Sequence, residues 1–189
     1  MKRIIITSLI GITTLTTTPL VLPLLPQQSY AQTSNSQIQQ LEQLLKTALQ
    51  QNRQYQYQEA IETLQQALAI ARKIKDREKE AVANLGLGWN YSSIGKPQEA
   101  LNFYNEALMI YREVGDRLGE ATTLNNIGEL YRNIGQPQKA LEYYEQALPV
   151  MQEVGNRSGE AYALNNIGLV YHSTSQPQKA LEYYEQALP

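Results

Sequence analysis

The side chains best suited to metal or nucleophilic chemistry are scarce in this chain. His172 is the only histidine in 189 residues, and there is no cysteine. A helical zinc motif needs a second histidine, and the other structural zinc sites need thiolates. A cysteine nucleophile and a disulfide framework are excluded for the same reason. We therefore predict no metal site and expect His172 to be a solvated surface side chain.

One dipeptide, Gly95-Lys96, resembles part of a phosphate-binding loop. That motif requires a glycine five residues before the Gly-Lys pair and a serine or threonine directly after it. Asn90 and Pro97 stand at these two places. We interpret Gly95-Lys96 as a turn between two helices and predict no bound nucleotide.

Paired glutamates could suggest general acid–base catalysis. Glu142 and Glu145 recur as Glu182 and Glu185, forty residues later. A catalytic pair would have to be duplicated together with its segment, whereas a solvated helix face explains the recurrence directly. We predict no catalytic residue, no cofactor and no enzymatic activity.

The glutamates belong to an internal repeat with a period of 40 residues. Residues 135–148 recur as residues 175–188 with a single change, and the sequence Gly-Glu-Ala at 119–121 recurs at 159–161. Looser copies occur closer to the amino terminus. The repeat therefore divides the chain into a degenerate first copy at 37–76, further copies at 77–116 and 117–156, and a truncated fourth copy at 157–189.

Each copy contains two segments with apolar residues at steps of three or four, which predicts a pair of amphipathic helices. In the third copy we expect helix A at 117–134 and helix B at 137–154. Gly135 suits the left-handed position after a helix, and Pro137 suits the first helical turn. Because one pair cannot bury its apolar stripe alone, the pairs must stack. The predicted fold is an all-α, right-handed superhelical solenoid of antiparallel helix pairs.

Two details modify this prediction. Pro149 lies inside the third helix B, where we expect it to kink the helix. Asp116 and Asn156 precede helices A and are expected to cap them.

The repeat resembles the tetratricopeptide repeat (TPR) family. A 40-residue period exceeds the usual length of about 34 residues, and the Val-Gly-Asp-Arg-x-Gly-Glu-Ala junction is similar to the kinesin-light-chain-like subclass. That subclass includes exported bacterial proteins that often carry a caspase-like (CHAT) protease domain downstream. The resemblance implies a protein-binding scaffold. The residues that carry it are Leu124, Ile127, Gly128, Tyr131, Ala140, Tyr144 and Ala147, which we expect to form the core.

A solenoid of this type lines its concave surface with helix A residues beside the core stripe. In the family that the repeat resembles, an asparagine before the Leu-Gly or Ile-Gly pair commonly holds the backbone of an extended peptide. Asn126 and Asn166 match that place, and an amide suits it because it both donates and accepts hydrogen bonds. The predicted peptide-binding groove comprises Asn126, Asn166, Asn125, Asn165, Trp89, Glu129, Arg132, Tyr162, Leu169 and His172.

The groove residues also have a purely structural interpretation. The asparagines could satisfy neighbouring helix A side chains, because buried amides usually find local partners. Trp89 could pack between repeats instead of anchoring a ligand side chain.

The amino terminus has the pattern of a secretory signal peptide. Lys2 and Arg3 precede an uncharged stretch from Ile4 to Leu25. Ser29 and Ala31 then place small residues at the two positions that a signal peptidase reads. We predict a signal peptide at 1–31, cleavage after Ala31, and a short polar linker at 32–36. A transmembrane anchor is the alternative, but three prolines in this region disfavour a spanning helix. Cleavage leaves 14 basic and 18 acidic residues, a charge of −4, which disfavours a nucleic-acid partner.

Three functional hypotheses follow from these observations. The first is an exported scaffold, periplasmic or extracellular, that binds an extended peptide or a helix of a partner protein in the groove. The second is a sensing arm of a larger protein with a caspase-like protease domain after residue 189. The third is end-to-end self-association through an uncovered apolar end of the solenoid.

Overall fold

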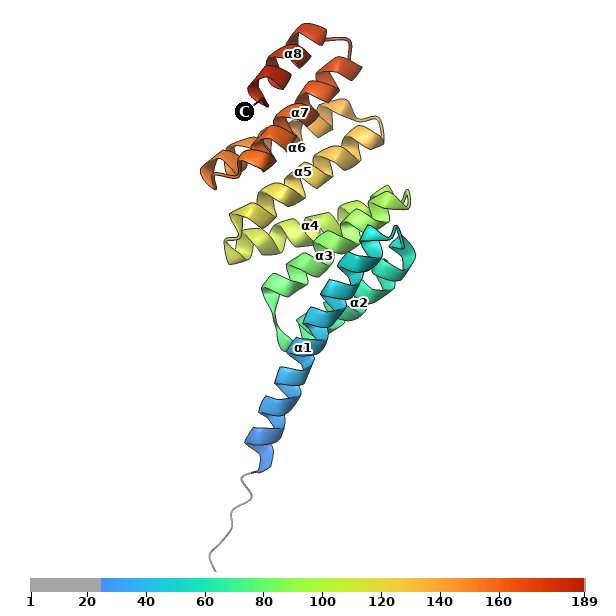
Figure 1. The fold of residues 1–189 in the computed structure, drawn as a ribbon, viewed down its shortest axis with the longest axis vertical. Coiled ribbons are helices and arrows are strands. Elements are labelled where there is room, and N and C mark those ends of the chain that lie inside the picture. Colours follow the sequence, from blue (N-terminus) through green and yellow to red (C-terminus); the bar gives the residue numbers. More distant parts are fainter. Residues whose placement is uncertain (1–24, 189) are drawn as a thin grey trace, which may run out of the picture.

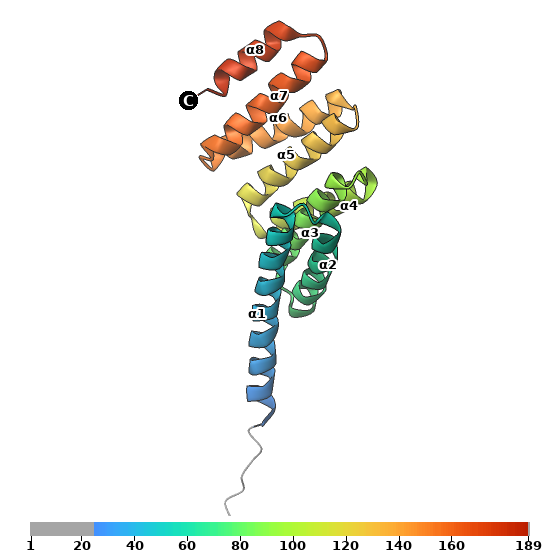
Figure 2. The same ribbon diagram turned by 45° about the vertical axis from the view of Figure 1, so that its right-hand side comes forward.

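The computed structural model describes residues 25–188, with side chains from residue 35. Within that range the structure contains helices and no strand. Successive helices pack as antiparallel pairs stacked along the long axis of the molecule (Figures 1 and 2), which confirms the predicted all-α repeat solenoid. The helices are α1 (Leu25–Arg53), α2 (Tyr57–Ile74), α3 (Arg77–Ser93), α4 (Pro97–Val114), α5 (Arg117–Asn133), α6 (Pro137–Glu153), α7 (Arg157–Ser173) and α8 (Pro177–Gln186).

Helix ends in the third copy lie within one residue of the prediction, because the local signals act as expected. Gly135 adopts the left-handed conformation with φ of +73°. Pro137 occupies the first turn of α6. The Asp116 carboxylate accepts a hydrogen bond from the Gly119 amide at 2.9 Å, and Asn156 makes the equivalent cap at the start of α7. Both predicted caps are therefore confirmed.

The amino-terminal predictions fall largely outside the described residues. Residues 1–24 of the predicted signal peptide are not described, and α1 begins at Leu25. The helix includes Ala31 and the segment 32–36, so the expected polar linker is helical here. Pro26 is compatible with this helix because the first turn does not use its missing N–H. In Figures 1 and 2, α1 extends well beyond α2. None of the described helices is long and apolar enough to cross a membrane.

Glycines allow close contact between the two helices of a pair. A Cβ atom placed on Gly128 would lie 2.7 Å from the Tyr144 ring, which is closer than packing permits. The equivalent glycines of α3 and α7, Gly88 and Gly168, lie against Tyr104 and Tyr184 in the same way. The predicted core role of Gly128 is therefore confirmed.

Tyr131 packs both within its own helix pair and between successive pairs. Its ring stacks on Tyr143 of the same pair, with centroids 5.4 Å apart. The Lys139 ammonium lies over the outer part of this arrangement, 5.1 Å from the Tyr131 centroid. Tyr131 also packs against a core cluster that includes Ile167 and Val170 of α7, so it fills space between successive pairs as well.

The predicted kink at Pro149 is not accompanied by a break in α6, which runs through it to Glu153. Pro149 itself is exposed. Val150 and Met151, immediately after it, are buried against Ala121 of α5. This apolar packing holds the last turn of α6 despite the missing backbone hydrogen bond.

Buried glutamates connect neighbouring repeats. Glu120 of α5 is 6% exposed and binds Arg112 of α4 at 2.8 Å as well as Arg117 of its own helix. Arg117 also forms an ion pair with Glu153 of α6, at 2.7 Å. Glu80, forty residues earlier, binds Arg72 and Arg77 in the same way. One buried carboxylate thus joins the helices that meet at each of these junctions.

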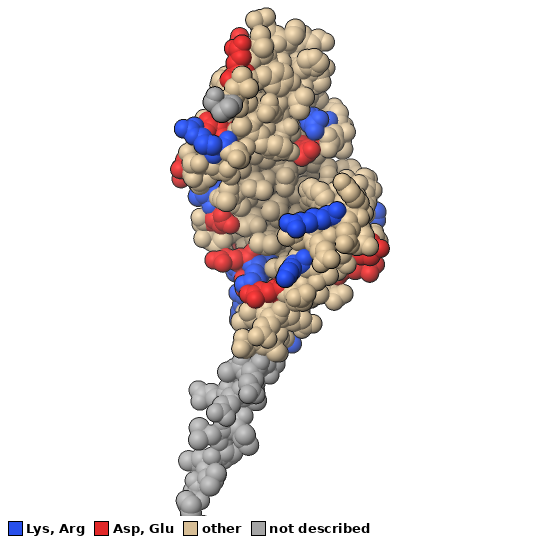
Figure 3. All heavy atoms as spheres, in the orientation of Figure 1, with Lys and Arg blue, Asp and Glu red and all other residues tan. Residues whose placement is uncertain are grey.

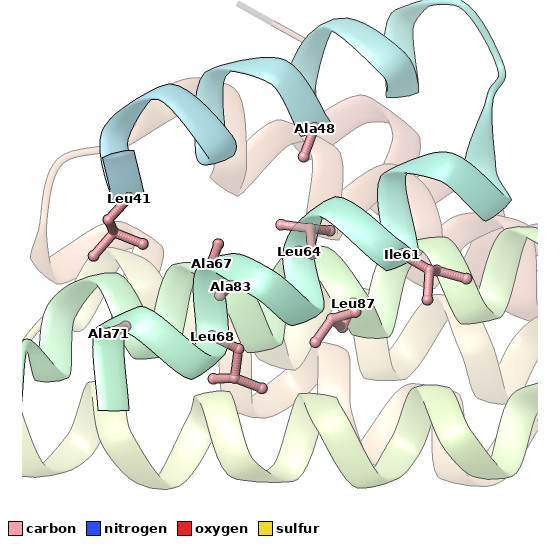
Figure 4. Packing of buried hydrophobic residues seen from close by; sticks show 9 residues of the cluster. All are labelled: Leu41, Ala48, Ile61, Leu64, Ala67, Leu68, Ala71, Ala83 and Leu87. Atoms are coloured by element: carbon pink, nitrogen blue, oxygen red, sulfur yellow. The ribbon is translucent and has the colours of Figure 1, made fainter. Parts of the chain in front are cut away.

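The first repeat is packed into the solenoid like the others. Figure 4 shows its core, in which Leu41 and Ala48 of α1 face α2, and Leu87 of α3 completes the cluster. Leu64 extends from α2 toward α1 in this view. The degenerate copy predicted at 37–76 is therefore a full helix pair.

Candidate binding groove

Helices α1, α3, α5 and α7 form the inner side of the solenoid. Helix α3 contacts α5, and α5 contacts α7, whereas α4 and α6 make no comparable contact with each other. Helices on the concave side of a superhelix are closer together than those on the convex side. Side chains beside the core stripe of these four helices therefore line a groove. Figure 3 shows that the visible face of the molecule is mostly uncharged, with charged side chains single or in small groups.

A polar cluster occupies the groove between α5 and α7. The Tyr162 hydroxyl of α7 donates a hydrogen bond to the Glu129 carboxylate of α5 at 2.8 Å. Arg132, one turn along α5, lies 3.6 Å from the same carboxylate. The structure therefore brings together three of the residues that the sequence predicted for the groove.

Several polar atoms around this cluster are buried without a hydrogen-bond partner among the described residues. They include the side-chain oxygen of Asn125, Oδ1, and the side-chain nitrogen of Asn166, Nδ2. Asn125 is 3% exposed and Asn166 is 5% exposed. Arg132 Nε and the Tyr144 hydroxyl are also unpaired. An unpaired buried polar group costs about 1–3 kcal/mol, so a ligand that supplies the missing partners would gain from this arrangement.

The tyrosines of the cluster keep their protons at neutral pH. Burial raises the pKa of the Tyr162 hydroxyl, as does its hydrogen bond to Glu129. The nearby Asn166 amide lowers this pKa, although its nitrogen does not complete a hydrogen bond to the hydroxyl. Burial also raises the pKa of Tyr144 and of Tyr104. These hydroxyls therefore act as neutral donors and acceptors, which suits the recognition of amides.

The groove changes character between α1 and α3, where it is apolar. A hollow of about 370 Å³ opens here. Trp89 of α3 stands near it, with its ring edge-on to Tyr57 at 5.5 Å, and remains 38% exposed. The hollow is lined by Leu45, Lys46, Ala48, Leu49, Asn52, Leu64, Val82 and Gly86.

The other predicted groove residues line the rim. Asn126 is partly buried, whereas Asn165, Leu169 and His172 are exposed. His172 does not belong to a candidate metal site. The described part of the chain contains no group of three or more His, Cys, Asp or Glu side chains that could hold a metal ion.

The sequence prediction missed the contribution of α1 to the groove. The same 40-residue step that relates Asn125 to Asn165 leads backward to Leu45, and the step that relates Trp89 to Glu129 leads to Leu49. The register could therefore have identified both residues. It could not have identified the unpaired Tyr144 hydroxyl, because this tyrosine is a fully buried residue of the helix B core.

A comparison of the sequence with curated proteins finds no match. Among solved structures, BtubC (BKLC) from P. vanneervenii is similar over 75% of this chain and 59% of its own, with 24% identity and a TM-score of 0.68. A putative kinesin light chain with nearly identical TPR-like repeats from Podosopora anserina is similar over 78% and 72%, with 22% identity and a TM-score of 0.66.

A Rap protein complexed with competence and sporulation factor is similar over 79% of this chain and 42% of its own, with 21% identity and a TM-score of 0.74. At these identities the likeness shows the fold alone. This chain spans less than two thirds of the length of BtubC and of the Rap protein.

The sequence itself carries the assignment to a family. A tetratricopeptide repeat profile matches residues 44–113 and 115–189, which together make up most of the chain. Solenoids of this kind present extended concave surfaces and serve protein–protein interaction. The chain belongs to the tetratricopeptide repeat family.

Proposed function

We propose that this protein is a scaffold that binds an extended peptide segment of a partner protein in the groove. The observation that carries the proposal is the pair of buried, unpaired amide atoms, Asn125 Oδ1 and Asn166 Nδ2, beside the Glu129–Tyr162 hydrogen bond. One atom is an acceptor and the other a donor. A peptide backbone offers the complementary N–H and C=O groups at each residue, whatever its side chains.

The charge of the groove also favours a peptide. The charges of Glu129 and Arg132 have opposite signs, so the cluster presents no excess of positive charge. Nucleic-acid recognition depends on basic patches that neutralise phosphates. A mixed polar surface with neutral hydroxyls and amides fits a protein segment better.

A selection experiment tests this function. The protein is used to select peptides from a random 12-residue library displayed on phage, and the best peptide is measured by fluorescence anisotropy. Replacing both Asn125 and Asn166 by alanine is expected to weaken its binding at least about tenfold, because two hydrogen bonds are lost. Asn105→Ala, at an exposed asparagine of α4 outside the groove, is the matched control and leaves binding unchanged. Failure to select any peptide, or equal binding by the double variant, contradicts the proposal.

We also propose that the protein works outside the cytoplasm. The basic start, uncharged stretch and small residues before Ala31 support this localisation. Expression of the full chain in its native cells followed by amino-terminal sequencing tests it. A mature protein that starts at Gln32 agrees with the proposal, and an intact Met1 contradicts it.

The sensing arm of a larger protein with a caspase-like protease domain remains a prediction. It depends on residues beyond 189. Reading the gene past codon 189 decides it, because such a domain requires a histidine and a cysteine in an α/β region.

A further inference from the structure

Resting on the peptide-binding function, we propose that the hollow between α1 and α3 is a side-chain subsite. It takes one large apolar side chain of the bound peptide, leucine, isoleucine or phenylalanine, with an acidic residue next to it. The subsite gives the scaffold a sequence preference, whereas the polar cluster between α5 and α7 reads only the backbone.

The walls of the hollow are aliphatic and partly open to solvent. Leu49 of α1 is 53% exposed and Val82 of α3 is 44% exposed. Leu64 of α2 is buried beneath them and forms the floor. Covering such a surface with an apolar side chain removes it from water on both sides, which is the main source of affinity at a peptide subsite.

The missing side chain of Gly86 helps to keep the hollow open. Asn126 and Asn166 occupy the equivalent positions of α5 and α7. A Cβ atom on Gly86 would lie 3.0 Å and 3.2 Å from the two methyl carbons of Leu64. Any side chain at position 86 would therefore displace Leu64 or occupy the hollow itself.

Two polar groups at the hollow indicate what accompanies the apolar side chain. The side-chain oxygen of Asn52, Oδ1, is buried and has no hydrogen-bond partner among the described residues. It is an acceptor, so a backbone N–H of the peptide fits it. Lys46 is exposed at the rim and forms no ion pair in the described part of the chain. A carboxylate beside the apolar residue would complement its charge.

The distance between the two sites sets the length of the ligand. The hollow lies between α1 and α3, and the polar cluster lies between α5 and α7, two helix A steps further along. With about 10 Å between neighbouring helices and about 3.3 Å per residue of an extended chain, this span corresponds to about six residues. A 12-residue peptide can therefore occupy both sites at once.

The same 12-residue phage library, selected in parallel on the wild-type protein and on Gly86→Asn, tests the subsite. The wild type is expected to enrich peptides with leucine, isoleucine or phenylalanine at one position and aspartate or glutamate beside it. The selected peptide, labelled for anisotropy, is expected to bind Gly86→Asn about ten- to a hundredfold more weakly, the range for losing one buried aliphatic side chain. Asparagine is the native residue at this position in the next two repeats, so the helix tolerates it.

Leu49→Asn is a second variant that keeps the fold, because Leu49 is largely exposed, and it is expected to weaken binding in the same direction. Met109→Asn on α4 alters an exposed apolar residue outside the hollow and is expected to leave affinity within about twofold. If selected peptides lack an apolar preference, or bind Gly86→Asn as tightly as wild type, the subsite is wrong while the peptide-binding function stands. If the library yields no binding peptide, both proposals fail.

Discussion

The two halves of the groove are built on the same repeat but present different side-chain chemistry. Between α1 and α3 the inner surface carries Leu49, Val82 and Gly86, whereas between α5 and α7 it carries Glu129, Tyr162 and Asn166. The helices are equivalent in register and packing. The difference shows that groove positions are free to vary because the core stripe, and not the groove, holds the solenoid together.

The core itself contains an exception in the apolar half. Asn84 of α3 is fully buried, and neither atom of its amide group has a hydrogen-bond partner among the described residues. Leu124 and Leu164 occupy the same place in the next two repeats. The second repeat thus combines an apolar groove with a polar defect in its core, and the third repeat shows the opposite arrangement.

Moving the defect into the third repeat should give the largest effect. Leu124→Asn buries an unpaired amide and removes an aliphatic side chain, so we expect it to lower the free energy of unfolding by about 3–5 kcal/mol. Urea denaturation followed by circular dichroism measures this change. Leu118→Asn, at an exposed leucine of the same helix, is the control and should change stability by less than about 0.5 kcal/mol. A small effect at position 124 would show that the repeats do not share one core.

Removing the defect from the second repeat should have a smaller effect of opposite sign. Asn84→Leu is expected to stabilise the protein by about 1–3 kcal/mol, because the unpaired amide disappears and the apolar side chain fits a site that accepts leucine elsewhere. The midpoint of urea denaturation should rise accordingly. Unchanged or lower stability would indicate that the Asn84 amide has a partner, such as an ordered water.

The junction before the second repeat should make stability depend on pH. Burial alone would raise the pKa of Glu80, but hydrogen bonds from Arg72 and Arg77 outweigh it and lower the pKa below its ordinary value. The stabilisation is therefore complete above the unfolded pKa of about 4.3 and is lost as the pH falls through the lower folded value. Glu80→Gln should cost about 1–2 kcal/mol at pH 7, and its stability should fall less than that of wild type between pH 5 and 3. Parallel denaturation curves across this range would contradict the assignment.

The smallest expected effect concerns the last turn of the polar half. Ser175 has φ of +60°, at the position where earlier repeats have Gly95 and Gly135. Ser175→Gly should raise the thermal midpoint slightly, by about 0.5–1 kcal/mol of stability, because glycine adopts this conformation without strain. Gln176→Gly, one residue later, is the control and should not stabilise.

Much of this molecule follows from local signals in the sequence. The Gly135-x-Pro137 turn and the Asp116 cap indicate where helices end and begin, and the structure agrees at both places. The period of 40 residues predicts that such boundaries recur along the chain. The core role of Gly128 was predictable because the same glycine recurs opposite an aromatic residue. The sequence could predict that Glu129 and Tyr162 both line the groove, but it could not predict the hydrogen bond between them. The two residues belong to different repeats, and their distance depends on the curvature of the solenoid.

The apolar hollow and the unpaired atoms escaped the sequence for a different reason. Gly86 looks like any helical glycine until Leu64, from another helix, is placed beneath it. Whether the Asn125 and Asn166 amides form hydrogen bonds with neighbouring side chains depends on differences of a few tenths of an ångström in distance. Such details arise from packing across helices, and no spacing rule within one helix contains them.

The near identity of the third and fourth copies has a practical consequence for engineering. Residues 135–148 and 175–188 differ at a single position, and Gly119 and Gly128 recur as Gly159 and Gly168, so inserting one further copy of residues 117–156 should continue the stack with the same geometry. Each inserted unit would then accommodate about three more residues of an extended ligand. The apolar hollow would stay between α1 and α3. The number of inserted repeats would therefore set the distance between the peptide's apolar side chain in the hollow and the far end of the peptide.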